Sequence, residues 1–197
     1  GQLWPSIRSY NEPMPGPMVV GMVGPVNVND PLTPGRGFQA WSGSSLTTTT
    51  AFVVDLNGAP VVAHAPFALP ISWTNTGNVE GDGWNLVGNP VASPIDFGTM
   101  SKGTDVRNMY WIFNPVSGSM DFWNEDLQTG SAGMNGNIQS SQAFWLKVDG
   151  PANTVSLTEA DKVNDPTGGL FGGSSMAPES RELAARPMVR VRITDLN

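Results

Sequence analysis

The only histidine in the chain, His64, is the first residue to test for catalytic chemistry. A serine hydrolase triad would need it beside a serine and an acid, but the chain has no Gly-x-Ser-x-Gly elbow. Histidine between two alanines of a predicted hairpin is more often structural or exposed. A histidine zinc site needs more than one histidine, and the chain has no cysteine to replace the others. His64 therefore predicts neither a triad nor a zinc site.

Carboxylates are the next candidates, because hydrolysis of a glycosidic bond needs two that face each other. The acidic residues that could supply such a pair are Asp96, Asp121, Glu125 and Asp126. They lie in or beside predicted turns, where a carboxylate is ordinarily solvated. A stand-alone hydrolase is therefore only a third alternative, and we predict that the chain is not an enzyme.

Two short turn sequences offer the hard oxygen ligands that Ca²⁺ prefers. These are residues 27–30 (Asn-Val-Asn-Asp) and 80–82 (Glu-Gly-Asp), and neither follows the EF-hand loop pattern. Asx turns explain the same residues without a metal. The metal site is thus unknown from sequence, a structural calcium is one alternative, and no other cofactor is predicted.

Tryptophan is abundant, with seven residues in the chain, and flat aromatic rings stack on sugar faces. Trp84 and Trp145 have apolar neighbours and are predicted to fill the core. The remaining candidates for a carbohydrate-binding surface are Trp41, Trp73, Trp111 and Trp123. Packing in the core or at a sheet edge is the simpler interpretation of these four.

Composition restricts the class of protein. The 197 residues include 23 Gly and 17 Pro but are 39% hydrophobic, which indicates many turns around a true core. The net charge is −7 without a Lys/Arg cluster, so nucleic acid is not an expected partner. No apolar run is long enough for a membrane helix, so membrane insertion is not expected either. The chain starts with Gly1-Gln2, from which we expect a fragment of a larger protein.

Period-two patterns and turn residues predict a β-rich chain with at most one short helix. The central feature is residues 83–90, Gly-Trp-Asn-Leu-Val-Gly-Asn-Pro, which read as a short buried strand stopped by Gly-Asn-Pro. Asn57-Gly58 is a preferred hairpin turn. The expected strands cover residues 35–41, 71–75, 142–148 and 154–157, with hairpins over 47–63 and 109–123.

Weak self-similarity divides the chain. An aromatic-Asn turn precedes an aromatic strand twice, at Tyr10-Asn11 before Phe38 and at Phe113-Asn114 before Phe144. This predicts a module over 1–165 with two repeats, about 1–82 and 83–165. A Gly/Ser-rich linker with a possible short helix at 178–185 is expected over 166–187, and 188–197 is expected to be a strand that returns to the sheet or begins a missing domain.

Residues 83–97 resemble the "GWNLVGNPYPSPIDW" signature of large bacterial surface proteins exported by the type IX secretion system, except that Val91 replaces the usual Tyr. Residues 34–38 are similar to the "PGRGY" of that family, residues 110–115 to its "IYVWNP", and residues 142–145 to its "QAFFV". Residues 190–195 are similar to its "LRLRLTD".

The resemblance implies a β-rich module of adhesins and large exported proteins, with no catalytic residues to transfer. Together with the patterns above, we expect an all-β sandwich or jelly-roll-like fold. The expected function is that of a non-catalytic structural or adhesive module, secreted or on the cell surface. Its partners would be neighbouring domains or subunits bound through sheet edges. The alternative is a carbohydrate-binding module, with polysaccharide as partner, attached to an absent catalytic domain.

Overall fold

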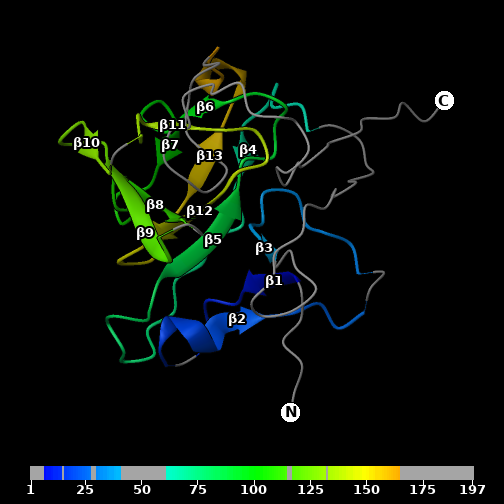
Figure 1. Ribbon diagram of the computed structural model, residues 1–197, viewed down its shortest axis with the longest axis vertical. Helices are drawn as coiled ribbons and strands as arrows, with labels where there is room; N and C mark the ends of the chain where they lie inside the picture. The colour runs from blue at the N-terminus through cyan, green and yellow to red at the C-terminus, as the bar shows by residue number, and fades with distance from the viewer. Residues whose placement is uncertain are drawn as a thin grey trace.

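The computed structural model describes residues 7–14, 16–27, 30–40, 61–114, 117–131 and 133–164 (Figure 1). Over these ranges the chain is all-β, as predicted, and its only helical elements are two 3₁₀ turns. The elements are β1 (Ile7–Tyr10), η1 (Met18–Gly21), β2 (Met22–Val23), β3 (Gln39–Ala40), β4 (Phe67–Ala68), β5 (Trp84–Gly88), β6 (Ile95–Asp96), β7 (Ser101–Lys102), β8 (Met109–Asn114), β9 (Ser119–Asn124), β10 (Thr129–Gly130), β11 (Asn137–Ile138), β12 (Ala143–Lys147), β13 (Val155–Leu157) and η2 (Glu159–Asp161).

The largest sheet has five antiparallel strands in the order β10-β9-β8-β12-β5. Three smaller antiparallel sheets accompany it, with orders β2-β1-β3, β4-β13-β7 and β11-β6. Figure 1 shows β5 and β12 in the middle, with β1 to β3 on one side and β4, β6 and β13 on the other. This layered arrangement of sheets agrees with the predicted sandwich-like fold.

The five-stranded sheet buries apolar side chains on both faces. On one face, Tyr110, Phe144 and Leu146 join the main core, which the small sheets complete through residues such as Ile95 and Leu157. The other face carries a smaller cluster centred on residues Tyr10, Leu86 and Trp145. Strand β5 lies between the two, because Leu86 pairs with Trp145 and Val87 with Phe144 across the ladder. This double burial explains why the adjacent Leu86 and Val87 are both apolar although they point to opposite faces.

The outer edge of β5 is covered by residues 35–37. The N–H of Gly37 donates to the Leu86 carbonyl at 3.0 Å, and the N–H of Gly88 donates to the Gly35 carbonyl at 2.9 Å. Gly37 must be glycine there, since a Cβ would lie 2.5 Å from the Val87 carbonyl oxygen. Two sequence motifs far apart in the chain, 34–38 and 83–90, are thus direct neighbours.

Asn89 holds the turn that ends β5. Its buried side-chain amide donates to the carbonyls of Ser93 at 2.8 Å and of Ile138 and Gln139, both at 3.1 Å. Its side-chain oxygen accepts the Val91 N–H at 3.0 Å. The strand predicted within 83–90 is confirmed, as is its end at Gly-Asn-Pro. Besides Pro90, Asn89 fixes this end, because its side chain binds the backbone of the distant residues 138–139.

The predicted strand at 71–75 is wrong: this segment belongs to no sheet. Its backbone N–H groups bind side chains instead of a neighbouring strand. Ser72 donates to the Asn85 side chain at 2.9 Å and Thr74 donates to Glu12 at 2.8 Å. Thr76 donates to Asp82 at 3.0 Å in the same alternating way. Side-chain oxygens therefore take the place of a ladder partner.

Other strand predictions have mixed outcomes. The hairpin at 109–123 is confirmed as β8 and β9, and the strands at 142–148 and 154–157 as β12 and β13. The predicted strand at 35–41 shrinks to β3, and the structure adds β10 and β11 between the predicted elements at 109–123 and 142–148. The hairpin at 47–63 falls almost wholly outside the described residues, as do the linker and terminal strand predicted over 166–197.

The two predicted repeats have a comparable local strand order. Around β1, which ends at Tyr10, the order is β2-β1-β3, and around β8, which ends at Asn114, it is β9-β8-β12. In each, the next strand along the chain pairs on one side and a later strand pairs on the other. The division at residue 82 itself stays a prediction.

Candidate functional site

A buried polar cluster lies where the N-terminal strand meets β5. Glu12 is 4% exposed, and its carboxylate accepts four hydrogen bonds. The donors are the Ser72 hydroxyl at 3.0 Å, the Thr74 N–H and hydroxyl at 2.8 and 2.9 Å, and the Gly83 N–H at 2.9 Å. A carboxylate with this many donors is fully occupied. Glu12 therefore joins three segments and has no free lone pair aimed at a ligand.

The ammonium group of Lys147 lies in the same region. It is 4% exposed, and its ammonium donates to the carbonyls of Val79 at 3.1 Å, Glu80 at 3.4 Å and Asp82. It also lies 5.3 Å from the centre of the Trp84 ring. Burial lowers the pKa of Lys147, an effect that Arg107 reinforces and nearby carboxylates oppose.

These contacts bear on the two candidate calcium turns. Three backbone carbonyls of the 79–82 turn already face the Lys147 ammonium, and the Asp82 carboxylate accepts the N–H and hydroxyl of Thr76. At the other turn, the Asn27 N–H donates to Asp30 at 2.8 Å. Within the described ranges, no group of three or more His, Asp or Glu side chains is arranged to hold a metal ion.

The structure brings two of the hydrolase candidates together. A Cβ placed on Gly98 would lie 2.6 Å from a Glu125 carboxylate oxygen and 3.1 Å from one of Asp96, so both carboxylates border this glycine. Both have structural partners: Asp96 accepts the Gly98 N–H at 2.8 Å, and Glu125 accepts the Trp123 indole N–H at 2.8 Å.

The other two hydrolase candidates are held by asparagines. Asp121 accepts from Asn114 at 2.9 Å and Asp126 from Asn108 at 2.7 Å. His64 is exposed and lies on a bend outside the strands. Most of these side chains therefore serve to fix turns and strand ends.

The four candidate tryptophans do not form one surface. Trp111 is directly opposite Phe122, whereas Trp123 is opposite Tyr110, so the register places the two tryptophans on different faces of the sheet. Trp123 is 8% exposed within the main core, and Trp73 packs against that core. Trp41 lies outside the described residues. Of the three that the structure describes, Trp111 has the setting closest to a binding surface.

Trp111 belongs to a row of apolar side chains that the described chain covers only in part. Phe113, Met120 and Phe122 share its side of β8 and β9 and are 42%, 36% and 37% exposed. We call Trp111, Phe113, Met120 and Phe122 the apolar face. At one end of the apolar face, Trp111 is covered by Trp84, because the two rings pack edge-on with their centres 4.9 Å apart. Its outer end faces solvent.

The geometry of the hairpin brings these side chains close. Phe122 exchanges hydrogen bonds with Ser131 on the outer side of β9, accepting from its N–H at 2.9 Å and donating to its hydroxyl at 3.1 Å. The backbone of Phe122 therefore points away from β8. The cross-strand pairs Trp111 with Phe122 and Phe113 with Met120 are thus non-hydrogen-bonded pairs, whose side chains approach most closely.

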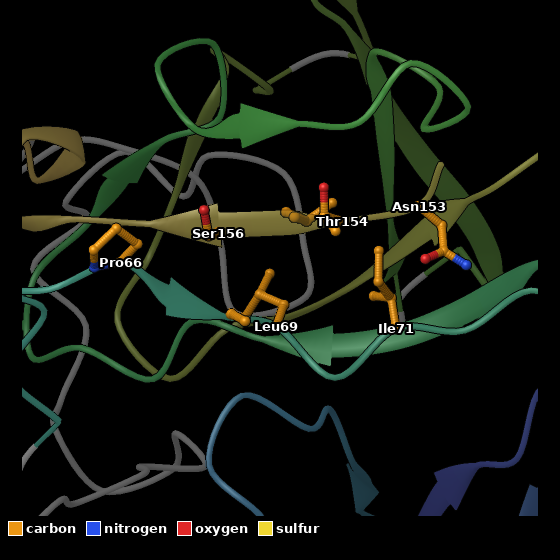
Figure 2. Close-up of a pocket in the computed structure, with 8 residues that line it drawn as sticks. Pro66, Leu69, Ile71, Asn153, Thr154 and Ser156 are labelled. Atoms are coloured by element: carbon orange, nitrogen blue, oxygen red, sulfur yellow. The ribbon is translucent and has the colours of Figure 1, made fainter. Parts of the chain in front are cut away.

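A cavity of about 340 Å³ lies elsewhere, beside β4 and β13 (Figure 2). Its walls are the chain around Pro66 to Ile71 and the chain from Asn153 to Ser156, which are joined by the Leu69 N–H donating to the Val155 carbonyl at 2.8 Å. Apolar side chains such as Leu69 and Ile71 line it with the polar Asn153 and Thr154. Among the described residues that line it, none has a titratable side chain.

Sequence reasoning missed Phe113, Met120 and Phe122 as surface residues. Apolar residues on both faces of a strand normally indicate burial on both sides. In β9 the charged Asp121 alternates with Met120 and Phe122, a pattern that puts it on the opposite side of the strand and normally indicates a buried apolar side. Only the pairing register of β8 and β9, together with the exposure of the side chains, shows which side of the hairpin is uncovered.

The comparisons with known proteins add no family. No family model matches the chain, no curated protein matches it, and no solved structure matches it. Among the described residues, no helix is long and apolar enough to cross a membrane.

Proposed function

We propose that this chain is a non-catalytic structural or adhesive module of a secreted or cell-surface bacterial protein, and that its apolar face binds a neighbouring domain or subunit. The observation that carries the proposal is the row Trp111, Phe113, Met120 and Phe122, which is anchored at one end and exposed at the other. Trp, Phe and Met are the residues enriched at the centres of protein interfaces. Methionine also adapts its shape to a partner.

The use of the acidic residues supports a non-catalytic role. Glu12 is saturated by backbone and hydroxyl donors, and Glu125 and Asp96 accept hydrogen bonds from groups that shape their own turns. The resemblance of residues 83–97 to exported bacterial surface modules supports the location outside the cell. Both arguments favour an architectural rather than a chemical task.

Sedimentation velocity over a concentration series tests the proposal. We expect the intact chain to associate as its concentration rises, because docking hides apolar area worth about 25 cal/mol per Å². The double variant Phe113→Thr/Phe122→Thr keeps β-forming residues and should remain monomeric. The control Val79→Thr changes another exposed apolar residue, 82% exposed, and should associate like the parent. Monomeric behaviour of the intact chain at every concentration would count against the proposal.

The alternative is a carbohydrate-binding module, favoured by the aromatic character of the same face. Trp111 and Phe122 present rings side by side, and such rings can stack on a sugar. Saturable quenching of tryptophan fluorescence by a polysaccharide, lost in Phe122→Thr, would support this function. An unchanged signal across a broad polysaccharide panel would leave the structural role as the better account.

A further inference from the structure

We infer that the apolar face is the docking site for residues 188–194 of a second copy of this chain. The inference deepens the proposed function, on which it rests, by naming the occupant. Residues 188–194 lie outside the described part of the chain, and their sequence alternates Val189, Val191 and Ile193 with Arg190, Arg192 and Thr194. An extended segment with this period presents an apolar side and a basic side.

The apolar side of this segment is suited to the apolar face, because its aliphatic side chains can pack against aromatic rings. Phe113 and Met120 lie directly opposite each other, as do Trp111 and Phe122, so the face is a short strip two strands wide. Aliphatic β-branched side chains are common neighbours of aromatic rings in packed sheets. A segment laid across the strip with its valines and isoleucine inward would cover the outer end, while its arginines would remain in water.

Charge favours this occupant over a symmetric dimer formed from two apolar faces. The net charge of the chain is −7, so two identical bodies repel each other. The 188–194 segment instead brings two arginines and no acid. The attraction between an acidic body and a basic segment would give a head-to-tail contact.

The end of the described chain favours a second copy over the same one. The Val163 N–H donates to the Pro94 carbonyl at 2.9 Å, and Lys162 bridges Ile95, which belongs to the main core. The described chain therefore ends on the side of the five-stranded sheet that is opposite to the apolar face. A segment from another copy reaches the face without wrapping around its own sheet.

The absence of cysteine from the chain allows a clean cross-linking test. One preparation of the full chain carries Met120→Cys, and a second, differently tagged preparation carries a single cysteine at position 189, 190, 191, 192 or 193. The two are mixed under mild oxidation and the heterodimer is quantified. We expect several-fold more heterodimer from Val189→Cys, Val191→Cys and Ile193→Cys than from Arg190→Cys and Arg192→Cys. Phe122→Cys in place of Met120→Cys should give the same alternation.

Two results would overturn the inference. Equal yields at all five positions would mean that the segment does not lie on the face with one side inward. Yields no higher than with Val79→Cys, an exposed position away from the face, would mean that it does not dock there. If the chain still associates and the Phe113→Thr/Phe122→Thr variant does not, the proposed function stands and only the occupant is wrong.

Discussion

The carboxylate of Glu12 accepts the backbone N–H of Gly83 at 2.9 Å, although the two residues are 71 positions apart. The same carboxylate accepts from Ser72 and Thr74, so one buried side chain fixes the N-terminal strand against the entrance to β5. Because all these donors are satisfied by a single group, its loss would leave several of them without a partner.

We therefore expect Glu12→Ala to reduce the free energy of unfolding by about 2–4 kcal/mol, as removal of a buried charged hydrogen-bond acceptor usually does. Glu12→Gln keeps one acceptor oxygen and should cost less, about 1–2 kcal/mol. Urea denaturation followed by tryptophan fluorescence measures both. If the two variants were as stable as the parent, Glu12 would not hold these segments together.

Two glycines of β5 and its entrance provide a matched pair of substitutions. Gly83 has φ +75°, and a Cβ there would lie 1.9 Å from the Val148 carbonyl oxygen. Gly83→Ala should therefore cost at least about 3 kcal/mol through strain and the displacement of Val148, the residue that follows β12. At Gly88 the nearest atom would be the Arg36 carbonyl oxygen at 3.4 Å, so Gly88→Ala should change stability by less than about 1 kcal/mol. Thermal unfolding of the two variants measures the difference in stability. Equal losses of stability in Gly83→Ala and Gly88→Ala would contradict the prediction.

Asn89 is predicted to resist even its closest replacement. Its amide donates to the carbonyls of Ser93, Ile138 and Gln139, so Asn89→Asp would turn a donor into a buried carboxylate facing acceptors. The expected cost at neutral pH is about 3–5 kcal/mol. Protonation of the introduced carboxylate would remove part of this cost. The variant should therefore be closer to the parent in stability at pH 5 than at pH 8. A difference independent of pH would rule out the charge as the cause.

The carboxylate of Glu159 makes stability depend on acid pH. The ammonium of Lys162, at 2.7 Å, and next the Ala63 N–H, at 2.8 Å, hold the pKa of Glu159 below its ordinary value of 4.5. Its contribution is fully present above the unfolded pKa and is lost as the pH falls through the lower folded pKa. Glu159→Gln should therefore flatten the decline in urea midpoint between about pH 5 and pH 3. An identical decline in the variant would show that other carboxylates cause it.

Local patterns predicted those strands that pair with near neighbours or are buried on both faces. The β8–β9 hairpin follows from a β-prone run and the Ser117-Gly118 turn, and β5 follows from Trp84, Leu86 and Val87 before the Gly-Asn-Pro stop. Residues 71–75 have the same local features and were predicted as a strand. Their partners are the side chains of Glu12 and Asn85, which no local pattern reveals.

The candidate surface could be predicted only in part for a similar reason. Sequence indicated Trp111 and Trp123 as equal candidates, but a pairing register that puts Tyr110 opposite Trp123 sends one ring outward and the other into the core. Likewise, nothing in the composition shows that the cover provided by Tyr10 and its neighbours stops before Phe113. These outcomes depend on tertiary contacts.

The side-chain partners of residues 72–76 also affect the order of folding. Ser72, Thr74 and Thr76 have no strand ladder to build on, so their backbone settles only when Glu12, Asn85 and Asp82 are already in place. Glu12 reaches Ser72 and Thr74 across 60 and 62 positions, and contacts of such long range form late because the loop must first close. Hydrogen exchange should therefore find the amide of Thr74, which donates to Glu12, protected after those of β8 and β9, which makes this segment the closing step of the fold.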